Sequence, residues 1–122
     1  MSTQVVNVKQ KLSVFNEYWN PKVVGDLNNH QVKVAKLKGE FVWHHHENED
    51  ELFLVVKGSL LIHLRDKTLE IHEGEFVIIP KKVEHKPVAK EEVHVILIEP
   101  NGTLNTGNVE SDQFTKKNLE AI

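Results

Sequence analysis

The chain has 122 residues, 39% of them hydrophobic and 27% charged, which is the composition of an ordinary globular protein of one domain. Its formal net charge of -3 excludes the strongly basic surface that nucleic acids and anionic membranes attract, so neither is expected as a partner. It contains no cysteine, which excludes disulfides and leaves histidine, aspartate and glutamate as the side chains able to hold a metal.

The N-terminal segment predicts a short helix rather than a targeting signal. It lacks the apolar stretch of a secretory signal, and no run in the chain is long enough to span a bilayer, so we expect a cytoplasmic protein. Four apolar residues recur at helical spacing: Val8, Leu12, Phe15 and Trp19. We predict a helix over residues 7–19, begun by Asn7 and stopped by Pro21. Three roles are open for this helix: it packs the apolar stripe on the body of the domain, it caps one opening of the barrel, or it docks on a partner subunit.

Residues 22–99 have the pattern of a β-barrel core within a single domain that takes in residues 1–122. A tight turn at Asn28-Asn29 precedes β-rich runs at 31–37, 40–46, 51–56, 59–65, 68–72, 76–79 and 93–99. Turn and breaker residues such as Gly58, Pro80 and Pro87 separate them. Many short strands without a helix-length segment between them predict an all-β antiparallel sandwich or barrel. The tail, residues 100–122, is expected to form a short helix or an arm on the surface.

The run 51–56 is apolar on both faces. Leu52 and Leu54 alternate with Phe53 and Val55, whereas a sheet with one face in water would carry polar residues on that face. A second sheet, the N-terminal helix or a partner subunit must therefore cover the other face. A homodimer is the natural hypothesis.

Histidine is the unusual feature of the composition, with eight in the chain. On a strand, His44 and His46 point to one side and His45 to the other. A polar turn then leads to Glu51, and His85 follows the strand that ends at Pro80. Each of these residues alone is more often a solvated surface group. Two imidazoles one alternation apart can nevertheless reach one metal ion, and the other two side chains could complete the site.

The spacing of these residues resembles the two signature motifs of the cupin superfamily. The first motif is matched by Gly39, His44, His46, Glu51 and Gly58, and the second by Gly74, Pro80 and His85. Gly39 stands one residue closer to the histidine pair than is usual in the family. Lys82 and Ala89 replace a glycine and an asparagine of the second motif. The flanking segments look like short bacterial cupins often labelled mannose-6-phosphate isomerase-like, a label that carries little weight for function.

The resemblance implies an antiparallel jelly-roll barrel that holds a divalent transition metal on His44, His46, Glu51 and His85. Fe, Mn, Ni, Co, Cu and Zn all suit these ligands. If the strands alternate as in other cupins, apolar side chains line the pocket: Phe53, Val55, Leu60, Ile62 and Leu64. Four residues are candidates for a general base by their type alone, although a solvated role is favoured for each: Glu49, His63, His94 and Glu99.

The remaining histidines and Trp43 carry less information. His45 and Trp43 share the outward face, where His45 is a candidate to support the site or an interface, and packing is favoured for Trp43. His30 and His72 lie in predicted turns and are expected to have no special role.

These observations favour a metal-dependent enzyme that acts on a small oxygenated molecule. A dioxygenase and an isomerase or lyase both remain open, because a metal with free positions serves either chemistry. The alternative is a non-catalytic cupin that binds or senses a small molecule. A purely structural role is disfavoured, because burying three histidines and a glutamate without a metal is costly.

Overall fold

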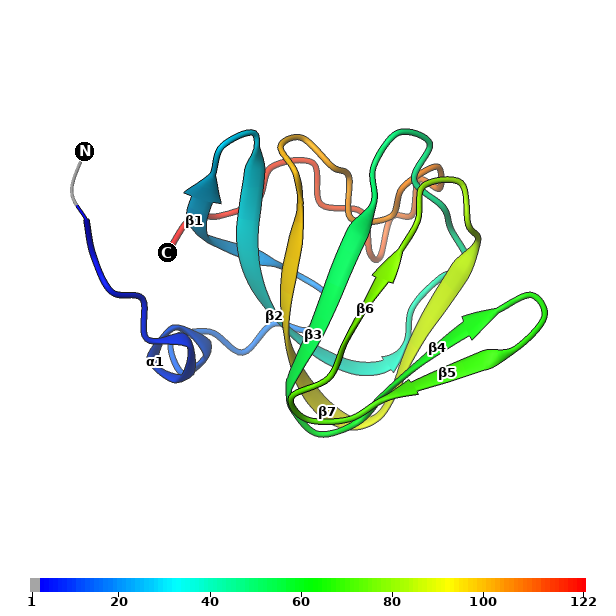
Figure 1. Cartoon of the computed structure of the whole chain (residues 1–122), viewed down its shortest axis with the longest axis horizontal. Coiled ribbons are helices and arrows are strands. Elements are labelled where there is room, and N and C mark those ends of the chain that lie inside the picture. Colours follow the sequence, from blue (N-terminus) through cyan, green and yellow to red (C-terminus); the bar gives the residue numbers. More distant parts are fainter. Residues whose placement is uncertain (1–2) are drawn as a thin grey trace.

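A computed structural model describes residues 3–122, which form an antiparallel β-structure with one short helix (Figure 1). The elements of this part are α1 (Val8–Leu12), β1 (Lys22–Leu27), β2 (His30–Glu40), β3 (Glu51–Lys57), β4 (Leu60–Leu64), β5 (Thr68–Ile71), β6 (Phe76–Ile79) and β7 (His85–Pro100). The strands pair in the order β1-β2-β7-β3-β6, and β4 joins β7 to β5. The predicted all-β antiparallel class is confirmed.

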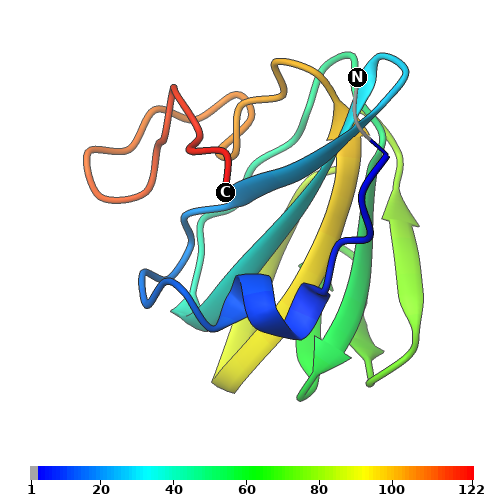
Figure 2. The same ribbon diagram turned by 90° about the vertical axis from the view of Figure 1, so that its left-hand side faces the viewer.

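The longest strand, β7, holds the two halves of the barrel together. It pairs with β4 near its start and with β2 and β3 further along, and Figures 1 and 2 show it curving through the fold. The prediction of a strand only over 93–99 was wrong, because Pro87 does not break it. Pro87 lacks an N–H, but it pairs opposite Ile62, and its carbonyl accepts a bond of 3.0 Å from the amide of Phe41.

The predicted strand over 40–46 was also wrong. Strand β2 ends at Glu40, after a register shift between Leu37 and Gly39, where Gly39 has a φ of +84°. Beyond it the chain leaves the sheet and touches β7 through one isolated bridge, His44 to His85. The expected turn at Asn28 is confirmed, with a φ of +54° between β1 and β2.

The helix is shorter than the predicted 7–19. Asn7 caps it as expected, accepting a bond of 3.0 Å from the amide of Gln10, but α1 ends at Leu12. The chain then lies along β2, because Lys36 donates to the carbonyl of Phe15 at 2.7 Å and accepts from the amide of Trp19 at 2.9 Å. The predicted stripe therefore divides: Leu12 and Phe15 cover the outer face of the sheet, and Trp19 enters the barrel interior.

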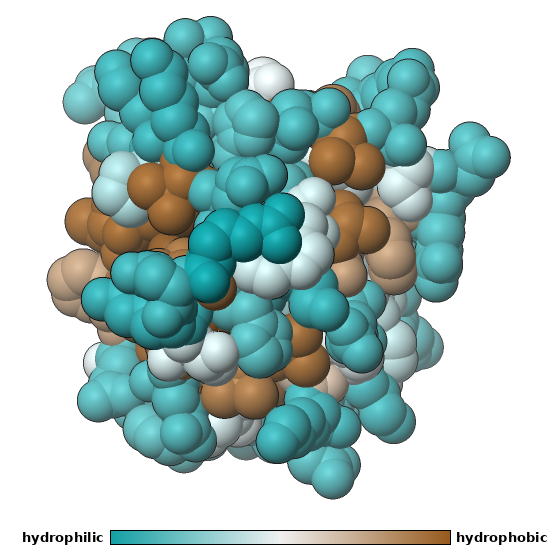
Figure 3. Space-filling view, turned by 90° about the vertical axis from the view of Figure 1, so that its right-hand side faces the viewer, coloured by the Kyte–Doolittle hydropathy of each residue, from teal (hydrophilic) through white to brown (hydrophobic). Residues whose placement is uncertain are grey.

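The interior of the barrel is the main hydrophobic core, and it contains Phe53, Val55, Leu60 and Ile62. The outer face is only partly covered. On β6, Phe76 and Ile78 are 62% and 51% exposed, opposite Leu54 and Leu52 of β3. Figure 3 shows apolar atoms gathered along one margin of the face that it views and in smaller patches between polar side chains.

The tail forms an arm rather than a helix. Residues 101–122 run as loops beside β1 in Figure 2, and Ala121 makes a bridge with Val23. The buried ammonium of Lys22 ties both ends of the fold together, with Glu17 at 2.9 Å and Glu120 at 3.0 Å. No helix among residues 3–122 has the length and apolar character needed to cross a membrane.

Candidate metal centre

Four side chains from separate parts of the chain meet inside the barrel. His44 and His46 come from the loop after β2, Glu51 begins β3 and His85 begins β7. One possible ligand atom of each lies within 4.8 Å of the others, and all four residues are buried. The predicted alternation is correct although the predicted strand is not, because His44 and His46 point inward and His45 is less buried.

Backbone contacts position this loop against β7. The amides and carbonyls of His44 and His85 exchange two hydrogen bonds, of 3.0 and 2.9 Å. The amide of Lys82 donates to the carbonyl of His46 at 2.7 Å, and the amide of Lys81 donates to Asp50 at 2.8 Å. Lys82 occupies the position where the second cupin motif has a glycine, and it retains the left-handed backbone of that glycine, with a φ of +71°.

Two of the imidazoles are oriented by the carbonyl two residues earlier in the chain. His44 Nδ1 donates to Val42 at 2.9 Å, and His85 Nδ1 donates to Val83 at 3.0 Å. A proton on Nδ1 leaves Nε2 with a free lone pair, which is the form that binds a metal. In the centre, Glu51 Oε1 lies 3.3 Å from His46 Nε2 and 3.4 Å from His85 Nε2.

The electrostatics favour unprotonated ligands. Burial, reinforced by the neighbouring His85, lowers the pKa of the His44 imidazole to about 4. Burial also opposes ionisation of Glu51, but its contacts with His46 and His85 outweigh that effect and hold its pKa well below the usual range. At neutral pH His44 is therefore a neutral imidazole and Glu51 an ionised carboxylate.

Several polar atoms at the centre of the cluster lack a partner. Within residues 3–122, the buried His46 Nε2, His85 Nε2 and Glu51 Oε1 make no hydrogen bond. Such atoms are costly to bury and rare in folded proteins. A divalent cation would satisfy all of them, and its charge would be reduced to +1 by one carboxylate. The residues present therefore fit a transition metal with nitrogen and oxygen ligands.

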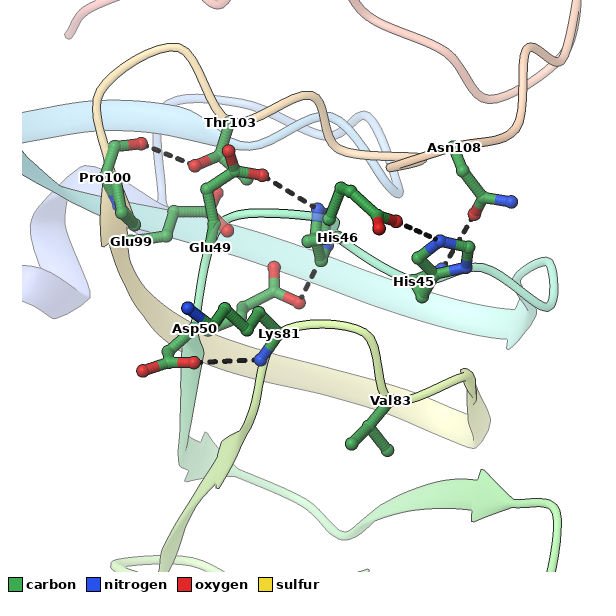
Figure 4. Close-up of polar contacts among 12 residues, drawn as sticks. His45, His46, Glu49, Asp50, Lys81, Val83, Glu99, Pro100, Thr103 and Asn108 are labelled. Carbon is green, nitrogen blue, oxygen red and sulfur yellow. Dashed lines mark hydrogen bonds and ion pairs between the residues drawn. The ribbon is translucent and has the colours of Figure 1, made fainter.

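The tail supports the metal-binding loop from outside. The amide of His45 donates to Asn108 Oδ1 at 2.8 Å, and the amide of Asn108 donates to the carbonyl of His45 at 3.0 Å (Figure 4). Gly107 has a φ of +55°, and a Cβ there would overlap the carbonyl oxygen of His45 and approach the ring of His44. In the sequence these residues belong to a tail predicted as a short helix or an arm, and nothing in the pattern of that tail indicates a contact with His45.

A cavity adjoins the cluster and opens towards the surface. It offers about 30 Å³ to the centres of water-sized molecules, room for roughly two of them. Its lining comprises Trp19, Pro21, Leu37, Phe41, His44, Glu51, Phe53, Pro87, Leu97, Glu99 and Asn105. Of the five predicted lining residues, Phe53 is therefore at the cavity. Val55, Leu60 and Ile62 belong to the core, and Leu64 packs against it.

The candidate general bases lie in different environments. Glu99 lines the cavity, and burial together with the Glu51 carboxylate raises its pKa well above the usual range. Glu49 Oε1 is 3.9 Å from His46 Nδ1, which is too far for a hydrogen bond. His63 bonds Thr68 at 2.8 Å, and His94 bonds Glu92 at 2.7 Å, both away from the cavity lining.

The other residues singled out in the sequence make contacts elsewhere. The guanidinium of Arg65 lies 3.8 Å from the ring centre of Trp43, so Trp43 has a packing role against Arg65. His45 Nε2 is 2.9 Å from Glu47. His30 and His72 bond Asn29 and Ser59 at 2.8 and 3.0 Å.

Known proteins match both the sequence and the fold. The family model described as "Cupin domain" matches residues 31–99. A cupin-2 domain containing protein from Shewanella frigidimarina is 47% identical, with a TM-score of 0.79 over 80% of this chain and 95% of that chain. Protein NMB1881 from Neisseria meningitidis is 31% identical, with a TM-score of 0.74 over 80% and 100% of the two chains.

A third relative is similar over a shorter stretch. The uncharacterized protein YdbB of Bacillus subtilis (strain 168) is 41% identical over 64 residues, which make up 52% of this chain and 57% of that protein. The similarity thus spans little more than half the length of that relative.

Proposed function

Because this chain belongs to the cupin family, we propose that it is a metal-dependent enzyme whose divalent ion is held by His44, His46, Glu51 and His85. One observation carries the proposal: three ligand atoms at the centre of a buried cluster have no hydrogen-bond partner within residues 3–122. A fold maintained only for stability would replace them with apolar side chains.

The substrate we propose is a small oxygenated molecule that enters the cavity beside the cluster. When bound, a divalent transition metal with four protein ligands supplies Lewis acidity and open coordination positions. The chain itself supplies an apolar wall beside the ligands, with Phe53 and Leu97 among its members. Its polar groups beside the ligands are few, which restricts proton transfer to Glu99 among the lining residues that are not metal ligands.

That scarcity of proton-transfer groups favours a second candidate, a cupin that binds or senses a small molecule without converting it. The two differ in turnover. A metal-loaded enzyme converts a member of a panel of hydroxy acids, diols and enols, whereas a binding protein changes only its thermal stability in their presence.

The metal assignment is tested by elemental analysis of untagged protein prepared without chelators. We expect about one transition metal ion per chain in the wild type, and loss of the metal in His46→Ala and Glu51→Ala. His30→Ala is the matched control, because His30 lies at the start of β2 outside the cluster. Full metal content in all three variants, or no metal even after reconstitution, would overturn the proposal.

We also propose that a second copy of the chain covers the outward face of β3 and β6. Phe76 and Ile78 are more than half exposed there, and within residues 3–122 β6 pairs on one side only, with β3. Exposed apolar side chains beside a free strand edge are typical of a surface that is covered in the functional assembly.

A further inference from the structure

A second charged group is buried inside the barrel, next to the metal cluster. Lys33 of β2 and Glu99 of β7 are each 1% exposed, and Lys33 Nζ lies 2.7 Å from Glu99 Oε1. Both side chains point inward. Lys33 lies on the same face of β2 as the core residue Ala35, and Glu99 lies on the same face of β7 as Leu97. A buried ion pair adds little stability compared with apolar residues of similar size, so stability does not account for this pair.

The lysine satisfies only one oxygen of the carboxylate. Glu99 Oε2 is buried and has no hydrogen-bond partner among residues 3–122. Glu99 lines the same cavity as the metal ligands His44 and Glu51. Figure 4 places the Glu99 side chain at the end of β7, in the region that also contains Glu49 and His46. A carboxyl oxygen that is not paired with the lysine therefore stands at the wall of a mostly apolar cavity, beside the Glu51 carboxylate.

We propose that the Glu99 carboxyl group makes a hydrogen bond through Oε2 with a hydroxyl group of the ligand that occupies this cavity, and that Lys33 holds the carboxyl group in position. This inference rests on the proposed metal site. It narrows the ligand class to small molecules with two neighbouring oxygens, one for the metal and one hydroxyl for Glu99, as in α-hydroxy acids. The cavity holds roughly two water-sized groups, so any larger part of the ligand must extend towards the opening.

The test compares two probes that differ by one hydroxyl, glycolate and acetate, titrated calorimetrically into metal-loaded protein. We expect wild type to bind glycolate at least about tenfold more tightly than acetate, because acetate leaves the buried Glu99 oxygen without a hydrogen-bond partner. The informative variant is the double substitution Lys33→Met with Glu99→Leu, which removes both members of the pair together and so leaves neither one buried alone.

In the double variant we expect the metal content to stay at the wild-type level, while the preference for glycolate disappears. The inference is overturned if wild type binds the two probes equally, or if the preference survives in the double variant. Its failure is distinguishable from that of the proposed function. A wild-type protein that takes up no metal overturns both, whereas a metal-loaded protein without the hydroxyl preference overturns this inference alone. Glu99→Gln, which retains the shape of the side chain, serves as a second variant should the double substitution fail to fold.

Discussion

Gly107 provides a sharp test of how the tail supports the metal centre. Gly107→Ala places a methyl group against the carbonyl of His45 and forces a left-handed backbone on alanine. The backbone conformation alone costs about 1 kcal/mol. Moving the segment away also breaks the two hydrogen bonds between Asn108 and His45, at about 1 kcal/mol each. We therefore expect the free energy of unfolding to fall by about 3 kcal/mol.

The same tail contains a matched control. Gly102 has a φ of +79°, but a Cβ there would meet no atom within 4 Å. Gly102→Ala should therefore cost only the backbone strain of about 1 kcal/mol. Both variants are unfolded with urea in metal-free form, and their metal affinities are measured by competition with a chelator.

The metal affinity separates support of the site from general stability. Because Gly107 lies against the loop that carries His44 and His46, its substitution should weaken metal binding by about 10- to 100-fold. Gly102→Ala should leave the affinity unchanged. Equal losses of stability and of affinity in the two variants would refute the reasoning.

Three further predictions concern protonation, assembly and backbone strain. The pKa of His44 is about 4 in the folded chain and about 6.5 when unfolded, so the unfolding free energy of metal-free protein should fall as the pH drops from about 6.5 to 4, by about 3 kcal/mol. His44→Gln should flatten this dependence in urea titrations, whereas His72→Gln should not. In light scattering, the wild type should have twice the chain mass of 14.0 kDa, whereas Phe76→Glu should have the mass of one chain. Leu27→Glu, on β1, is the control and should remain dimeric. Lys82→Gly should raise the unfolding free energy by up to about 1 kcal/mol, since it relieves a left-handed lysine; a loss of stability would contradict this.

The inward set of side chains could be predicted because alternation is a local property. Phe53 and Val55 share the face of Glu51, and His44 and His46 share a face even though their segment is not a strand. The spacing of these residues along the chain was therefore enough to predict the cluster of metal ligands. The two apolar faces of β3 predicted that another element or subunit covers the outer one, and Phe76 and Ile78 of the neighbouring β6 are exposed on that side.

What could not be predicted depends on partners far away in the sequence. Pro87 looks like a breaker until Ile62 and Phe41 are placed beside it. The roles of Gly107 and Lys33 arise from contacts with His45 and Glu99, each more than 60 residues away. The helix was predicted too long because Phe15 and Trp19 have helical spacing, yet contacts with β2 decide their conformation.

The central position of β7 has a consequence for how the chain folds. Its three partner strands, β2, β3 and β4, all precede it, and its register with β2 pairs His30 with Pro100. Non-local pairing of this kind makes folding slow, on the order of milliseconds to seconds. Strand β7 also brings His85 to the other ligands, so we expect the metal centre to be assembled after the folding transition state rather than to serve as a nucleus. Metal added during refolding should therefore leave the folding rate unchanged and slow only the unfolding rate.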